Sequence, residues 1–147
     1  MNISAKSKYA IRALVELADR TAGHPDRPVR LTDVAAGREI PLQFLEQLFS
    51  ALRRAGVLRS RRGASGGYSF ARPPETVTVL EIVNALDGAV SPAVCTQGEC
   101  EHLDGCGAAS VWLEAKNAVD DVLRRTTIAD LLEREQSTLA RSMMYQI

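Results

Sequence analysis

The fold of this chain is decided by residues 31–56, which read LTDVAAGREIPLQFLEQLFSALRRAG. Thr32 is a residue type that caps helices, so we expect it to open a short first helix. A tight connection then leads into a second helix, with Pro41 just inside its start and Gly56 just past its end. A short helix, a tight turn and a longer helix make up a helix-turn-helix unit, and the sequence predicts one here.

The second helix of this unit has one apolar and one polar face. Its apolar stripe consists of Leu45, Leu48, Phe49 and Leu52. The opposite face carries hydrogen-bonding and basic side chains: Gln43, Glu46, Gln47, Ser50, Arg53 and Arg54. An α-helix fits the major groove of DNA, where amide and carboxylate groups reach base edges. We expect Gln43 and Glu46 to read bases, the glutamate selecting sequence rather than adding affinity because it repels phosphates.

Residues 57–72 follow directly and read VLRSRRGASGGYSFAR, which predicts a β-hairpin with a glycine-rich turn. A hairpin appended to a helix-turn-helix is a wing. Four arginines suit phosphates or an adjacent minor groove: Arg53, Arg59, Arg61 and Arg62. We expect the turn to approach DNA without a Cβ clash through its glycines, Gly66 and Gly67.

The charge of the chain is divided between its halves. Residues 1–74 hold 13 Lys and Arg against 6 Asp and Glu, whereas residues 75–147 hold 5 against 12, so that the net charge is zero. This asymmetry predicts a front half that binds a polyanion, and together with the helix-turn-helix and the wing it favours double-stranded DNA. Arginine-rich hairpins also occur as protein-binding surfaces, so an acidic partner protein stays an alternative.

Composition excludes several classes of protein. With 147 residues, 46% of them apolar and 24% charged, the chain fits one globular domain with or without an arm. It holds no run of about 18 uncharged apolar residues, so we expect no contact with a membrane. Charged residues interrupt the N-terminal stretch, which a signal peptide would need to be apolar, so we expect a cytoplasmic location. No phosphate loop, nucleophile–base set or paired carboxylates stand out, so we expect no enzyme.

The remaining pattern predicts a mainly α fold with a small β-hairpin wing. We expect further helices at about 4–20, 79–86 and 108–125, and a last one to about Leu139 opened by the capping pair Thr127 and Asp130. The long helix has an apolar stripe with little core to pack on. We expect it to pair with its own copy in a homodimer, the alternative being packing on the first helix of the same chain. The predicted units are a DNA-binding domain over 1–74, a linking helix and cysteine loop over 75–107, and a dimerisation helix with tail over 108–147.

All three cysteines fall in the irregular stretch 88–107, with the spacing Cys95-x4-Cys100-x5-Cys106. Clustered thiols in a reducing compartment indicate metal or redox chemistry. Thiolates suit iron–sulfur clusters or zinc, and three bare redox thiols are the third alternative. A fourth metal ligand would come from elsewhere, and the candidates within the loop are Glu99, Glu101, His102 and Asp104.

Several of these stretches together resemble one family, the IscR/NsrR/RirA/CymR-type winged helix-turn-helix regulators, and IscR in particular. The resemblance covers about residues 1–135 and rests on ISAKSKYA at 3–10, LEQLFSALR at 45–53, the glycine-rich hairpin turn and the cysteine loop before a long helix. It implies a homodimeric transcription regulator, expected to act as a repressor. Several members hold an iron–sulfur cluster in that loop, whereas CymR-type members have none.

The resemblance also implies roles for single residues. Glu46 matches the recognition-helix glutamate, Arg62 the wing arginine, and the three cysteines the cluster ligands. This chain departs from the pattern in three places: its first cysteine gap is one residue shorter, and Ala109 and Lys8 stand where an IscR-type histidine and an NsrR-type acidic ligand stand. The cluster type, 2Fe–2S or 4Fe–4S, and the fourth ligand therefore stay open. The resulting expectation is a regulator that senses iron, redox state or nitric oxide. The alternatives are a cluster-free CymR-like regulator of cysteine or sulfur metabolism and a zinc-stabilised protein-interaction module.

Overall fold

The computed structural model describes residues 3–89 and 105–146. The predicted fold class is confirmed, since the described part consists of helices and one two-stranded antiparallel hairpin. In chain order its elements are α1 Ala5–Arg20, α2 Leu31–Arg38, α3 Leu42–Arg54, β1 Leu58–Arg61, β2 Gly67–Phe70, the 3-10 turn η1 Pro74–Thr76, α4 Val79–Asp87, α5 Gly107–Arg125 and α6 Ile128–Tyr145.

Side-chain caps open α1, α4 and α6, whereas α2, α3 and α5 start without one. Ser4 caps α1, and Thr127 and Asp130 form the predicted capping box of α6, which continues to Tyr145 rather than ending near Leu139. The prediction for Thr32 is wrong because α2 begins at Leu31, so that Thr32 lies inside the helix and Arg30 holds the cap position without a side-chain bond. The neighbouring Val29 pairs with the hairpin in an isolated β-bridge, which keeps the chain extended up to the helix.

Two smaller differences concern the start of α3 and the turn before it. Pro41 occupies the cap position of α3 rather than its first helical position. Glu39, between α2 and α3, has a φ of 53°, which is the left-handed conformation that most side chains avoid. The turn of the helix-turn-helix therefore holds a strained non-glycine residue.

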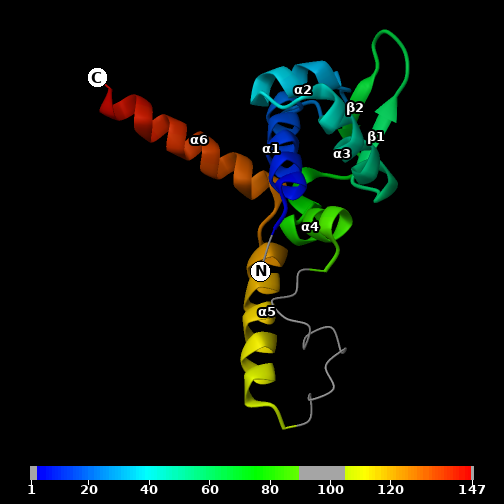
Figure 1. Cartoon of the computed structure of the whole chain (residues 1–147). Coiled ribbons are helices and arrows are strands. Elements are labelled where there is room, and N and C mark those ends of the chain that lie inside the picture. The colour runs from blue at the N-terminus through cyan, green and yellow to red at the C-terminus, as the bar shows by residue number, and fades with distance from the viewer. Residues whose placement is uncertain (1–2, 90–104, 147) are drawn as a thin grey trace.

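The core is built around α1. Figure 1 shows α1 at the centre with α2, α3 and the hairpin on one side, α5 running away below α4, and α6 returning to α1 before it projects outward. Leu14, Leu45 and Phe49 are fully buried at the centre of this core. Phe49 of α3 meets Tyr68 of β2 edge to face, with ring centroids 5.3 Å apart. The hairpin is thus fixed to the recognition helix through aromatic packing.

The hairpin has an inner and an outer face. Ser60 pairs with Tyr68 in the register of the two strands, and Arg61 pairs with Gly67. Because side chains alternate along a strand and opposite residues share a face, Arg61 stands on the face away from the partly buried Tyr68 and from α3. β2 also pairs on its other edge with Val29, through two backbone hydrogen bonds of 2.8 Å. The wing is therefore connected to the segment that leads into α2.

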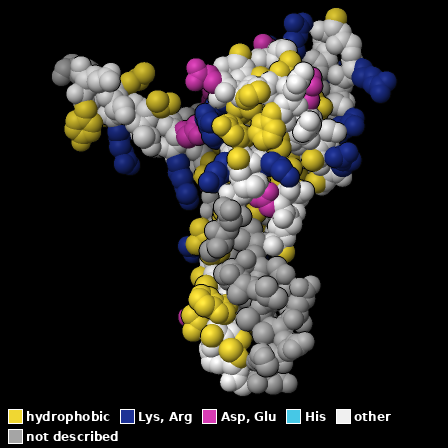
Figure 2. Space-filling view, viewed as in Figure 1, with side chains coloured by type: hydrophobic (Ala, Val, Ile, Leu, Met, Phe, Trp, Pro, Cys, Tyr) yellow, Lys and Arg dark blue, Asp and Glu magenta, His cyan; other side chains and the backbone are white. Residues whose placement is uncertain are grey.

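The C-terminal helices are only partly covered within one chain. α5 packs on α4 through Leu123, which contacts Val79 and Val83, and it has no buried residue. Large apolar side chains stay exposed along both helices: Val111, Trp112, Leu113 and Val122 on α5, and Leu139, Met143, Met144 and Tyr145 on α6. Figure 2 shows apolar side chains at the surface of both. In the part of the chain that the structure describes, none of the helices is long and apolar enough to cross a membrane.

Candidate nucleic-acid interface

The outward face of α3 carries a continuous polar surface. A shallow hollow on it is lined by Gln43, Glu46, Gln47, Ser50 and Arg54. These side chains gather because their positions recur at three and four along a helix whose opposite face is buried. The hollow offers amide, carboxylate, hydroxyl and guanidinium groups on a rigid helix, which is the chemistry that reads base edges and phosphates in a major groove.

Arg53 and Arg54 are placed differently. Arg53 donates a hydrogen bond of 3.3 Å to the Ser60 hydroxyl on β1, whereas Arg54 lines the hollow. From the helical pattern both are expected on the polar face, with Arg53 as the DNA contact. The spacing of Arg54 from Gln43, Gln47 and Ser50, which are eleven, seven and four residues before it, is the signal that singles it out.

The three wing arginines have different surroundings. Arg59 is fixed by an ion pair with Asp26 and by a hydrogen bond of 3.1 Å from Nε to the Ser69 hydroxyl. Arg61 stands exposed on the outer face of the wing. Arg62 follows β1 and is exposed in the turn. The structure thus shows one arginine engaged with neighbouring side chains and two that are open to a ligand.

Steric contacts within the protein explain why the hairpin turn has glycine at positions 66 and 67. A Cβ on Gly66 would be 2.1 Å from the carbonyl oxygen of Arg61, and one on Gly67 would be 2.3 Å from that of Val29. Both neighbours are backbone atoms, which cannot rotate away. Close packing of the hairpin on itself and on the Val29 segment therefore requires glycine at both positions, a reason separate from the close approach to DNA expected from the sequence.

Of the predicted metal ligands, Cys95 and Cys100 lie outside the described residues, and so do the candidates for a fourth ligand. Cys106 is at the cap position of α5, partly exposed and without a side-chain cap bond. Unpaired backbone N–H groups at the start of a long helix favour a negatively charged group, so this position suits a metal-bound thiolate. Within 3–89 and 105–146 no cluster of His, Cys, Asp and Glu could hold a metal ion by itself.

Two polar clusters connect the C-terminal half to α1 and α2. In the first, Arg38 at the end of α2 donates to Glu16 of α1 at 2.8 Å and makes two bonds to Glu135 of α6, at 2.8 and 3.2 Å. Burial raises the pKa of Glu16, but the bonds from Arg38 and Arg20 outweigh it, so that the pKa lies below its ordinary value. The bonds to Glu135, together with that to Glu16, outweigh burial and raise the pKa of Arg38. Both shifts favour the charged forms of Glu16 and Arg38.

The second cluster ties the end of α4 to the start of α1. Asp87 accepts hydrogen bonds from the Ser4 backbone at 3.0 Å, from the Ser7 hydroxyl at 2.8 Å and from the Ser4 hydroxyl. Burial raises the pKa of Asp87, but these bonds and the nearby Lys6 outweigh it and lower the pKa below its ordinary value. Asp87 thus fixes the point at which the chain leaves α4 toward the cysteine stretch.

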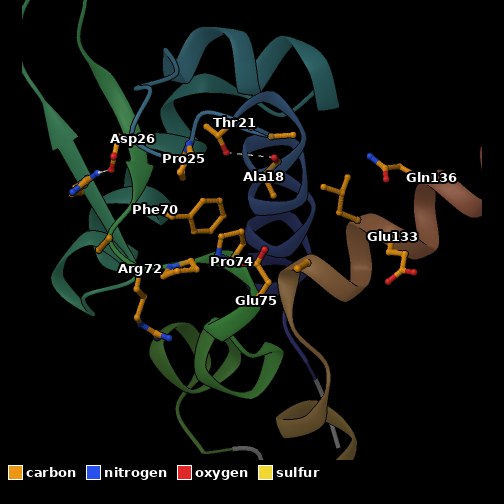
Figure 3. A pocket seen from close by; sticks show the side chains of 17 residues that line it. Ala18, Thr21, Pro25, Asp26, Phe70, Arg72, Pro74, Glu75, Glu133 and Gln136 are labelled. Carbon is orange, nitrogen blue, oxygen red and sulfur yellow. Dashed lines mark hydrogen bonds and ion pairs between the residues drawn. The ribbon is translucent and has the colours of Figure 1, made fainter.

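A cavity of about 660 Å³ lies where the wing base, α1 and α6 meet. Figure 3 shows Ala18 and Phe70 at its wall, with Glu75 and Glu133 at its edge. The two arginines that line it are already engaged with carboxylates, Arg59 with Asp26 and Arg72 with Glu81. The space between α6 and the base of the wing is therefore an open cavity and not a packed core.

Comparison with known proteins identifies the family. The profile of Rrf2, described as an iron-dependent transcriptional regulator, matches residues 3–134. The chain belongs to the Rrf2 family. It is 32% identical to the HTH-type transcriptional regulator CymR of Bacillus subtilis over 99% of both chains, and 31% identical to IscR of Escherichia coli over 92% of this chain and 83% of that one.

Solved structures of Rrf2 relatives agree with the fold. The structure of B. subtilis CymR, titled the global cysteine regulator, superposes with a TM-score of 0.78 at 33% identity, over 91% of this chain and 98% of that one. T. potens IscR gives a TM-score of 0.75 at 31% identity, over 94% and 90%. Rrf2 winged-helix regulators bind DNA as dimers. The chain is therefore a transcriptional regulator and not an enzyme, as the sequence predicts.

Proposed function

We propose that this Rrf2 regulator is a cytoplasmic repressor that binds operator DNA through α3 and the wing. In this proposal it senses iron, redox state or nitric oxide through an iron–sulfur cluster. The observation that supports DNA binding is the polar outward face of α3, which presents five hydrogen-bonding or charged side chains beside a hairpin that bears arginines. In this proposal α3 enters the major groove and the wing lies on the adjacent minor groove.

The proposed roles follow from where each side chain lies. Gln43, Glu46, Gln47 and Ser50 contact base edges, and Arg54 contacts a phosphate at the end of the same face. Arg62 in the turn reaches the minor groove or its phosphates. Arg53 acts indirectly, by holding β1 at a fixed distance from α3 through Ser60.

The proposed sensor is a cluster held by Cys95, Cys100 and Cys106, with its type and fourth ligand open. Three cysteines within twelve residues, the position of Cys106 at the start of α5 and the family description as iron-dependent support it. When bound, such a cluster supplies chemistry that iron supply, oxygen and nitric oxide alter. Cys106 would contribute one thiolate at the start of α5, the helix proposed to form the dimer interface, which is followed in the chain by α6.

The proposed dimer is built on α5. Val111, Trp112, Leu113 and Val122 expose between 43% and 55% of their surface in one chain, which is unusual for large apolar residues on one helix. Pairing of α5 with a second copy would bury Val111 and Val122, which share one face, and the neighbouring Trp112. Such a dimer would read two half-sites about one DNA turn, roughly 34 Å, apart.

A second candidate function is a cluster-free regulator of cysteine or sulfur metabolism. The similarity to CymR over 99% of the chain supports it. In that case the input would be a partner protein or oxidation of the thiols rather than loss of a cluster.

The deciding experiment compares protein purified without air as wild type and as Cys106→Ala, with Ser110→Ala as the control one helical turn into α5. We expect wild type and control to show visible absorption bands with iron and sulfide, and the cysteine variant to lose them. Operator binding is measured on DNA selected from a random-sequence pool. A colourless, metal-free wild type that still binds this DNA would favour the CymR-like function. A colourless protein with stoichiometric zinc and no DNA binding would favour the interaction module.

A further inference from the structure

A second basic surface lies on the outer face of the wing, away from α3. It is a hollow between the loop before α2 and the hairpin turn, and Arg27, Arg30 and Arg61 line it together with the turn residues 64–66. Arg27 and Arg30 come from the loop before α2 and Arg61 from the end of β1, and all three are exposed. Figure 2 shows Lys and Arg side chains standing out around the hairpin.

The charges in this hollow are not balanced within the described part of the chain. Arg30 donates one hydrogen bond of 3.1 Å to the carbonyl oxygen of Ala64, and Arg27 and Arg61 make no side-chain hydrogen bond or ion pair there. Asp33 is the carboxylate that lines the hollow, and Arg20 at its edge is already paired with Glu16. Gathering three guanidinium groups against one carboxylate is unfavourable unless an anion joins them.

We propose that this hollow binds DNA phosphates beside the groove that the wing enters, outside the bases read by α3. The turn residues 64–66 form one wall of the hollow, so a strand that meets Arg62 in the turn runs past Arg61 and Arg27. Guanidinium groups bind phosphate with paired N–H donors, and wing-side phosphates supply the missing negative charge. The proposal rests on the wing contacting DNA. It adds Arg27 and Arg30 to the interface and gives Arg61 a site apart from Arg62.

Arg30 also has a structural role in this hollow. Its guanidinium spans from the start of α2 to Ala64 and so fixes the turn relative to the helix-turn-helix. Arg30 is therefore a positioning residue as well as part of the charged surface. For this reason the test uses Arg27 and Arg61, whose replacement removes charge without removing a bond made among the described residues.

The experiment measures the affinity of wild type, Arg27→Ala, Arg61→Ala and the double variant for a selected operator duplex over a range of salt concentrations. Each neutralised phosphate contact changes the slope of log K against log salt by about 0.9, so the double variant should lose nearly two units of slope. At about 0.1 M salt its affinity should fall at least tenfold and approach that of wild type as salt rises. Arg141→Ala, an exposed arginine on α6, is the charge-matched control and should leave the slope unchanged.

Ethylation interference locates the contact. We expect the double variant to lose interference at one or two phosphates on the wing side, with the phosphates and bases around α3 unchanged. Wild-type slope and interference in the double variant would overturn the proposal and direct attention to an acidic partner protein. Loss at the α3 phosphates instead would also overturn it. An Arg62→Ala variant that binds as well as wild type would show that the wing itself does not contact DNA, which is a separate failure.

Discussion

Gly67→Ala distinguishes two reasons for a glycine in the wing. If glycine is there so that DNA can approach the backbone, the variant should fold normally and bind DNA weakly. The structure gives a different reason, because the new Cβ would meet the Val29 carbonyl oxygen at 2.3 Å and its carbon at 2.5 Å. We expect the variant to lose stability before any DNA is added.

The size of the loss can be worked out from the bridge between Val29 and Tyr68. Ordinary contact with a Cβ begins near 3.4 Å, so the two segments must separate by about 1 Å. That separation would break both 2.8 Å backbone hydrogen bonds of the bridge, worth about 1 kcal/mol each. Gly67 also has a φ of 154°, which disfavours a side chain, by roughly 1 kcal/mol. The free energy of unfolding should therefore fall by about 3 kcal/mol.

The assay is urea denaturation followed by circular dichroism, with Gly63→Ala as the matched control. Gly63 has a φ of 106° but no atom within 4 Å of its Cβ position, so it reports the conformational cost alone, about 1 kcal/mol. A Gly67→Ala variant no less stable than Gly63→Ala, yet impaired in DNA binding, would refute the steric reasoning and support the role in DNA approach.

Three further predictions concern the recognition face and the two polar clusters. Arg54→Ala should reduce the salt slope of operator binding by about one unit and Arg53→Ala should not, and equal slopes in fluorescence-anisotropy titrations would contradict the distinction between them. Asp87→Asn should reduce the loss of stability that acid causes. Because the pKa of Asp87 is lowered in the folded protein, its stabilisation is present above the unfolded pKa of about 3.9 and is lost as the pH falls through the folded pKa. If stability of the variant, measured by urea unfolding between about pH 5 and pH 3, falls as steeply as that of wild type, this role of Asp87 is wrong. Arg38→Gln should lower the free energy of unfolding by about 1–2 kcal/mol, since the partly buried Glu16 keeps only Arg20 as a partner, and it should also weaken operator binding; unchanged values in both assays would show that the cluster is not stabilising.

The local patterns predicted the fold well where short-range physics decides it. Apolar spacing and the proline and glycine at its ends located α3, and the Thr127–Asp130 pair opened α6 as expected. The prediction failed at Thr32, because the pairing of Val29 with Tyr68, nearly forty residues later, keeps the preceding chain extended. Helical periodicity also located the polar face of α3, but the choice between Arg53 and Arg54 depended on the contact of Arg53 with Ser60 across the wing.

Charged residues were harder to assign from the sequence than helices. A run of arginines in the hairpin predicted a DNA-binding surface without separating its members, whereas Asp26, thirty-three residues before Arg59, engages that arginine. Arg27 and Arg30 gave no signal because they belong to a proline-flanked loop that only the folded chain brings to the hairpin turn. Side chains that act through long-range neighbours therefore require the structure.

The connections of α5 and α6 offer two routes from the proposed sensor at Cys106 to the recognition helix α3. The end of α5 is joined to the start of α4 by a hydrogen bond of 2.9 Å from the Val79 N–H to the Thr126 carbonyl, and Leu123 packs in the same place. The chain then returns through α6, where Glu135 holds Arg38 at the last residue of α2. Only the strained Glu39, Ile40 and Pro41 separate Arg38 from α3. We therefore expect a displacement of α5 to be transmitted to α3 through α4 and through Arg38, and the loss of operator affinity predicted for Arg38→Gln tests the second of these connections.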